Sequence, residues 1–140
     1  MRKIEVTSRV VGRVVGLVPI DKHDHEAAER AIVAGYPAIE SSLPRLLEWI
    51  QDMNWPVAQT LAPFLASIGE PLIPHLEVIF ETEDEIWKAW IISRIVGESL
   101  PLAVHFRYYL EKLVDQETKD EDDEWVRDNA RDVLEKYGWL

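Results

Sequence analysis

Residues 54–76 read NWPVAQTLAPFLASIGEPLIPHL, and residues 84–106, thirty positions further along, read DEIWKAWIISRIVGESLPLAVHF. The two stretches match at a capping residue, at apolar residues three and four apart, and at a proline that opens a second segment. The matched pairs include Leu61/Ile91, Leu65/Ile95, Pro71/Pro101 and His75/His105. A repeat of this length is typical of stacked helical hairpins. We therefore expect an all-α fold that offers a surface rather than a catalytic cleft.

The first half of this unit recurs near the C-terminus, where Val126, Ala130 and Leu134 follow one another at helical spacing. Caps, prolines and apolar periods predict helices over about 24–34, 37–50, 54–68, 71–80, 84–96, 101–115 and 123–137. The capping residues expected from this pattern are Asp24, Asn54, Asp84 and Asp123. We expect Gly35 to end the first helix, Pro37 to open the second, and Pro63 to kink the third.

The pattern Asp-x-x-Val-Arg-x-x-Ala-x-x-x-Leu-x-x-Tyr-Gly over residues 123–138 resembles the first helix of a HEAT repeat. Residues 54–69 resemble it too, with Val57-Ala58 in place of Val-Arg. The resemblance covers about residues 24–140 and implies a HEAT/armadillo-like stack, an α-solenoid, of about three and a half helical hairpins. The whole chain, including residues 17–24 and 54–59, is similar to a small bacterial family of unknown function. That second resemblance implies no activity.

The domain organisation we expect is an N-terminal arm over residues 1–20 and one repeat domain over residues 21–140. The arm carries Arg2, Lys3, Arg9 and Arg13 beside several valines, as a signal peptide would. Arg9, Gly12 and Arg13 interrupt its apolar stretch, so we expect a short added strand or helix, or a loose tail. Nothing else approaches the apolar length of a membrane span, and we expect a cytoplasmic protein that does not bind membranes.

The charge and the cysteine content of the chain limit the kinds of partner and chemistry that we expect. The 140 residues carry a formal net charge of −11, the pI is about 4.7, and the chain has no cysteine. Because neutralising phosphates requires Lys and Arg, this charge argues against direct binding of nucleic acid and favours a basic protein partner. Disulfides, thiolate nucleophiles and Cys-ligated zinc are excluded, and an intracellular setting is expected.

Catalytic and metal chemistry have little support in the sequence. Asp21, His23, Asp24 and His25 form the densest group of potential metal ligands, but the carboxylates also suit a turn and a helix cap. His75 and His105 occupy matching repeat positions, which neighbouring helices hold about 8–10 Å apart. No nucleophile elbow or phosphate loop is present. We expect no enzyme activity, no metal and no cofactor.

Two groups of residues are candidates for binding. Exposed acids are expected at Glu81, Glu83, Asp84, Asp120, Glu121 and Asp122. These acids fit solvated loops and helix starts, or else a single anionic ridge that steers a cationic partner. Trp55, Trp87 and Trp125 sit at repeat starts and fit junction packing. Aromatic anchors for a partner are expected at Trp49, Trp90, Tyr108 and Tyr109.

The resulting hypothesis is a non-catalytic protein-binding module of the bacterial cytoplasm. In its sharper form it is an immunity or antitoxin-like inhibitor whose acidic face neutralises a basic toxin or a nucleic-acid enzyme. By the resemblance to HEAT stacks, helices over residues 38–51, 72–80 and 102–115 line the concave surface. Two alternatives stay open: a structural subunit of a homo-oligomer, and a metal-dependent protein that uses Asp21, His23, Asp24 and His25.

Overall fold

The protein is described by a computed structural model that covers residues 16–140. Within these residues every regular element is helical and no strand occurs, so the predicted all-α class is confirmed. Seven α-helices are present in this part of the chain: α2 (His25–Ala34), α3 (Leu43–Glu48), α4 (Pro56–Ile68), α5 (Ile73–Phe80), α6 (Glu85–Ile91), α7 (Leu100–Asp115) and α8 (Glu121–Lys136). Most of the predicted N-terminal arm, residues 1–15, lies outside the described residues.

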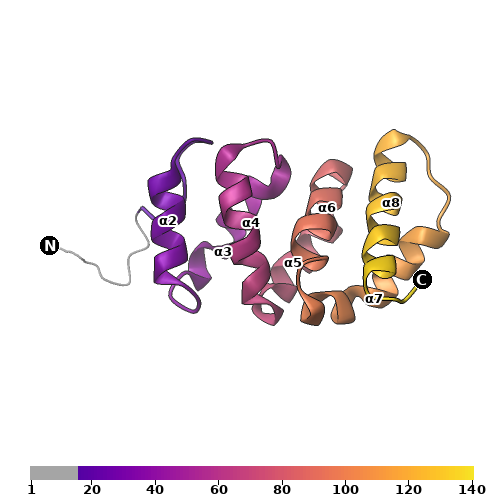
Figure 1. The fold of residues 1–140 in the computed structure, drawn as a ribbon. Coiled ribbons are helices and arrows are strands. Elements are labelled where there is room, and N and C mark those ends of the chain that lie inside the picture. The colour runs from indigo at the N-terminus through magenta and orange to yellow at the C-terminus, as the bar shows by residue number, and fades with distance from the viewer. Residues whose placement is uncertain (1–15) are drawn as a thin grey trace, which may run out of the picture.

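The helices alternate between two layers. Figure 1 shows α2, α4, α6 and α8 side by side in one row, with α3, α5 and α7 behind them in this view. α2 packs on α4, and α8 packs on both α6 and α7. None of the described helices combines the length and the apolar character that a membrane crossing needs. The arrangement places the beginnings of α6 and α8 next to each other.

The core lies between the two layers and follows the sequence repeat. Leu61 and Leu65 of α4 are buried, and so are Ile91 and Ile95 at the matching positions thirty residues later. Ala130 and Leu134, the corresponding pair in α8, are buried as well. Burial at equivalent positions is what a repeated hairpin requires, because each unit covers its apolar face only against its neighbours.

Several predicted helix ends are confirmed. The Asp24 carboxylate accepts the Ala27 backbone N–H at 3.2 Å, and Gly35 follows the last residue of α2 with a φ of 69°. This left-handed conformation favours glycine, which lacks a Cβ. Asp84 caps α6 by accepting the Trp87 N–H at 3.0 Å.

The starts of the second and third helices differ from the prediction. Pro37 does not open a helix, because residues 35–39 form a turn in which Ile39 N–H donates to the Gly35 carbonyl; a 3-10 turn (Glu40–Ser42) then leads into α3. Asn54 is not a cap. Its own N–H donates to the Asp52 carboxylate, and α4 begins at Pro56 without a side-chain cap. Pro63 lies inside α4, which is continuous.

The last helix begins two residues earlier than predicted. Asp120, rather than Asp123, is the capping residue, because its carboxylate accepts the Asp123 N–H at 2.9 Å. The Asp123 carboxylate in turn accepts the Lys119 N–H at 3.1 Å, so both acids hold the turn that leads into α8.

The fifth predicted helix changes its winding part-way along. α6 ends at Ile91, and residues Ile92–Val96 form a π-helical turn in which Gly97 N–H donates to the Ile92 carbonyl. A Cβ on Gly97 would lie 2.9 Å from the Ser93 carbonyl oxygen and 3.0 Å from a Val133 methyl. Gly97 therefore lets α8 approach this turn closely.

Candidate functional site

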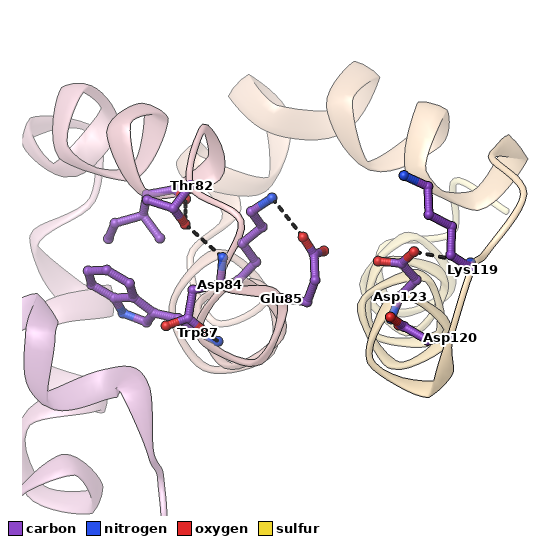
Figure 2. A network of polar contacts seen from close by, with 9 residues as sticks. Thr82, Asp84, Glu85, Trp87, Lys119, Asp120 and Asp123 are labelled. Atoms are coloured by element: carbon purple, nitrogen blue, oxygen red, sulfur yellow. Dashed lines mark hydrogen bonds and ion pairs between the residues drawn. The ribbon is translucent and has the colours of Figure 1, made fainter.

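Two acidic turns lie at the beginnings of neighbouring helices. We call the acidic edge the set formed by Glu81, Glu83, Asp84, Asp120, Glu121 and Asp122, all of which are exposed. Figure 2 shows α6 and α8 nearly end-on, with Asp84 at the beginning of one helix and Asp120 at the beginning of the other. α6 and α8 pack on each other. The structure thus places the two turns that contain the six predicted acids at the beginnings of two helices that pack on each other.

The six acids are not equivalent. Asp84 and Asp120 are helix caps, and each accepts a backbone N–H. The Thr82 hydroxyl extends the first cap, since it accepts the Asp84 N–H at 3.3 Å and donates to the Ile79 carbonyl at 2.7 Å. The other four carboxylates, those of Glu81, Glu83, Glu121 and Asp122, make no hydrogen bond or ion pair with residues 16–140. Their charge is therefore directed to solvent.

Tyr108 is the predicted anchor that the structure leaves open. It lies on α7 with 72% of its surface exposed, and the Lys112 ammonium lies 5.4 Å from its ring centroid. Val104, one turn earlier on the same helix face, is also exposed. A large aromatic beside an exposed aliphatic residue fits a contact surface.

Trp49 and Trp90 are half-buried packing residues instead. Trp49 meets Trp55 edge to face at 5.3 Å between ring centroids, and Trp90 meets Trp125 in the same way at 4.8 Å. Trp87 donates its indole N–H to the Leu47 carbonyl at 3.2 Å. Trp55, Trp87 and Trp125 thus pack between neighbouring helices, as predicted. Trp49 and Trp90, which were expected to be exposed, pack against two of them.

Tyr109 faces away from Tyr108 and forms the wall of a cavity. Its ring stacks on Phe80 at 4.7 Å between ring centroids, and both rings line a cavity of about 330 Å³ between α5, α6, α7 and α8. Burial, and then the nearby Glu85 carboxylate, raises the pKa of Tyr109 to about 12. Sequence reasoning did not single out Phe80, Glu85 or Lys88 at this place. The only local signal was the three-residue spacing of Glu85 and Lys88, which pair at 3.1 Å.

Residues 17–134 match the sequence profile of a domain family described as Domain of unknown function (DUF5071). The chain belongs to this family. The DUF5071 match spans α2 to α7 and most of α8, so it includes both acidic turns. No curated protein matches the chain. The expected family of unknown function is thereby confirmed, and a function for this DUF5071 domain has to be argued from its structure.

The acid and histidine group near α2 is engaged in turn geometry. Asp24 accepts the backbone N–H groups of Ile20 and Ala27, which lower the pKa of its carboxyl. Asp21 accepts the His23 N–H at 2.9 Å. Within residues 16–140 of the DUF5071 domain, no three His, Cys, Asp or Glu side chains are grouped as metal ligands would be. His105 of the other predicted histidine pair lies 3.6 Å from Glu77 on the neighbouring helix α5.

Proposed function

We propose that this DUF5071 domain is a non-catalytic protein-binding module built as a HEAT-like stack of about three and a half helical hairpins. The alternating layers and the burial of matched repeat positions support this architecture. A further support is the outer face of α8, which is charged and exposed at Glu124, Asp128, Arg131, Asp132 and Glu135. Terminal units of helical repeats need such a polar face to stop the stack.

The partner we propose is a basic protein. The observation that carries this proposal is the acidic edge, where four uncommitted carboxylates and two capping carboxylates gather at the beginnings of α6 and α8. Charge gathered on one side of a domain raises the encounter rate with a partner of opposite sign. The formal net charge of −11 acts in the same direction.

A sharper form of this proposal fits the same features. An immunity or antitoxin-like inhibitor in the bacterial cytoplasm would use the acidic edge to dock on the cationic surface of a toxin or a nucleic-acid enzyme. Tyr108 is the aromatic residue most available to anchor such a complex, because it is the most exposed of the four predicted anchors. In this scheme the edge governs association and Tyr108 governs dissociation.

A second candidate function is a structural role in a homo-oligomer. It is favoured by apolar side chains that α5 and α7 leave exposed, with Val78 open to 64% and Val104 to 57%. Apolar residues of this kind on neighbouring helices suit a self-complementary contact. Sedimentation equilibrium distinguishes the two candidates, because the oligomer forms without any other protein.

The proposed function is tested by affinity capture from native lysate with three baits. The first bait is the wild-type chain and the second carries Asn or Gln at all six residues of the acidic edge. The third is a charge-matched control with six exposed acids neutralised elsewhere, at Glu29, Glu40, Glu70, Asp128, Asp132 and Glu135. We expect a basic protein that is captured by the wild type and the control, and that high salt releases.

The captured protein is then purified and its association rate measured against salt concentration. We expect the edge variant alone to associate more slowly and to lose its salt dependence, because rim charges act mainly on the association rate. Equal losses in the edge variant and in the control would assign the effect to net charge. An unchanged rate and salt slope in the edge variant would rule out the acidic edge as the binding site.

A further inference from the structure

The cavity beside the acidic edge has features that suit a cationic side chain. Its volume is about 330 Å³, and its walls come from the end of α5, from α6 and α7, from the loop at residues 116–119 and from the start of α8. Phe80, Tyr109, Leu113 and Val126 supply its apolar lining. The cavity therefore combines an aromatic wall with charged side chains from the first turns of α6 and α8.

The aromatic wall is preformed. The rings of Phe80 and Tyr109 lie 4.7 Å apart with 30° between their planes, and Phe106 meets Phe80 edge to face at 5.1 Å. Three aromatic rings packed on one another hold the Tyr109 face in place without a ligand. Such a face binds a guanidinium group better than an ammonium group, because the guanidinium is planar and stacks.

Two carboxylates stand on opposite sides of the cavity. Glu85 belongs to the first turn of α6 and Asp123 to the first turn of α8, and Figure 2 shows both side chains directed into the space between the two helices. Asp123 is held by the Lys119 N–H at 3.1 Å. After burial, the Glu85 carboxylate is the second cause of the raised pKa of Tyr109, so this carboxylate lies close enough to the phenol to act on it.

The cavity also holds cations of its own. Lys88, Lys119 and Arg127 line it, and the Lys88 ammonium pairs with Glu85 at 3.1 Å although the side chain is only 12% exposed. Lys88 therefore already forms an ion pair with Glu85, the carboxylate that a cation from a partner would use. The lining also holds three carboxylates, those of Glu85, Glu117 and Asp123, so the lining acids and the lining cations are equal in number.

We propose that this cavity binds an arginine side chain of a basic protein partner, stacked on Tyr109 and paired with Glu85 and Asp123. The inference rests on the proposed function, since it gives the basic partner a specific point of attachment. Lys88 acts as a competitor for Glu85 and sets how tightly the arginine is held. The acidic edge draws the partner in, whereas the cavity selects arginine.

The probe for a direct test is N-acetyl-L-arginine amide, titrated into the full chain labelled with ¹⁵N. We expect saturable shifts at the amides of residues 113–119 and 126–127, with a Kd on the order of a few millimolar. N-acetyl-L-citrulline amide, which is neutral and nearly the same shape, should bind at least about ten-fold more weakly. Equal binding of citrulline, or arginine shifts spread over all acidic segments alike, would overturn the proposal.

Two substitutions inside the cavity give effects of opposite sign. Glu85→Gln should weaken arginine binding by about three- to ten-fold, whereas Lys88→Met should strengthen it, because Met keeps the length of the chain and removes the competing charge. Glu124→Gln is the matched control, since it makes the same charge change in the first turn of α8, next to Asp123 but outside the cavity lining. If Glu85→Gln and Glu124→Gln weaken binding equally, the arginine probe responds only to the overall negative charge, and the proposed contact with Glu85 is wrong.

Binding of N-acetyl-L-glutamate amide provides the reverse control. If this anion binds more tightly than the arginine probe, and Lys88→Met abolishes its binding, the cavity is an anion site and the proposal is wrong. Unaltered amide spectra of the variants away from residues 80–127 verify that each one folds. Failure here is separable from failure of the proposed function: a basic partner can be captured through the acidic edge without arginine binding, and the probe can bind without any captured partner.

Discussion

The Asp120 carboxylate should stabilise α8 by its hydrogen bond rather than by its charge. We compare two substitutions at this position, Asp120→Ala and Asp120→Asn. Alanine removes the oxygen that accepts the Asp123 N–H at 2.9 Å, whereas asparagine keeps an accepting oxygen and removes only the charge. This comparison also determines whether the acidic edge can be neutralised without unfolding the helix that carries it.

The magnitude follows from what each variant loses. Loss of a capping oxygen costs about 1 kcal/mol, within a range of about 0.5–2. Loss of the charge alone costs about 0.3–1 kcal/mol through the helix dipole, but α8 has four further acids in its first turn, and like charges at helical spacing repel by about 0.2–0.5 kcal/mol. These two charge effects nearly offset each other. We therefore expect Asp120→Asn to stay within about 0.5 kcal/mol of the wild type.

The assay is thermal and urea unfolding followed by far-UV circular dichroism. For a chain of this length, the loss in Asp120→Ala corresponds to roughly 3–4 °C in Tm. Asp122→Ala is the control, because Asp122 is exposed on the same turn and makes no hydrogen bond with residues 16–140. If Asp120→Asn or Asp122→Ala destabilises the protein as much as Asp120→Ala does, the hydrogen bond is not what stabilises the start of α8.

Three further predictions test the core, the turn before α2 and the cavity. Leu65→Ala removes a fully buried side chain and should cost about 2–5 kcal/mol in urea unfolding; a loss below about 1 kcal/mol would contradict the repeat packing. Asp24→Ala should lower the Tm while His23→Ala and His25→Ala leave it unchanged, and stoichiometric zinc in the purified protein, lost with both histidines, would contradict this cap assignment. The raised pKa of Tyr109 means that the folded state holds its proton where the unfolded state has released it, so stability should fall as pH rises from 10 to about 12. Tyr109→Phe should remove that slope, and an unchanged slope would refute the assignment.

The periodic part of the fold was predictable because burial obeys a simple rule. Leu61 and Leu65 recur as Ile91 and Ile95, and a helix that packs between two layers must bury one such stripe. The caps Asp24 and Asp84 were predictable for the same kind of local reason, since each is followed by a helix whose third N–H needs an acceptor.

The remaining ends could not be read from the same local pattern. At Asn54 the sequence offers a capping residue, but Asp52 accepts the Asn54 N–H and the chain turns before Pro56 starts α4. At the start of α8, Asp120 and Asp123 are both suitable caps by residue type. Two bonds decide which one takes that position, because Asp120 accepts the Asp123 N–H while the Asp123 carboxylate accepts the Lys119 N–H.

The candidate site was predictable in its charge and not in its shape. The acids at the starts of α6 and α8 are visible as runs in the sequence, and their exposure follows from that position. Whether an aromatic side chain is exposed depends on which side chains of the neighbouring helices pack against it. Tyr108 and Tyr109 are neighbours in the sequence, yet one faces solvent and the other stacks on Phe80. The cavity is formed by four helices and a loop, so no single stretch of sequence encodes it.

The number of acids at the start of α8 exceeds what the helix itself requires. One carboxylate, that of Asp120, caps the helix, and Asp123 braces the turn. A helix start carries roughly half a positive charge, which the cap alone offsets. Glu121, Asp122 and Glu124 therefore add repulsion without adding a hydrogen bond among residues 16–140. An excess of this kind, placed beside the acids of the neighbouring α6 turn, is not required for the stability of the fold, and it is the surface that the proposed basic partner would contact.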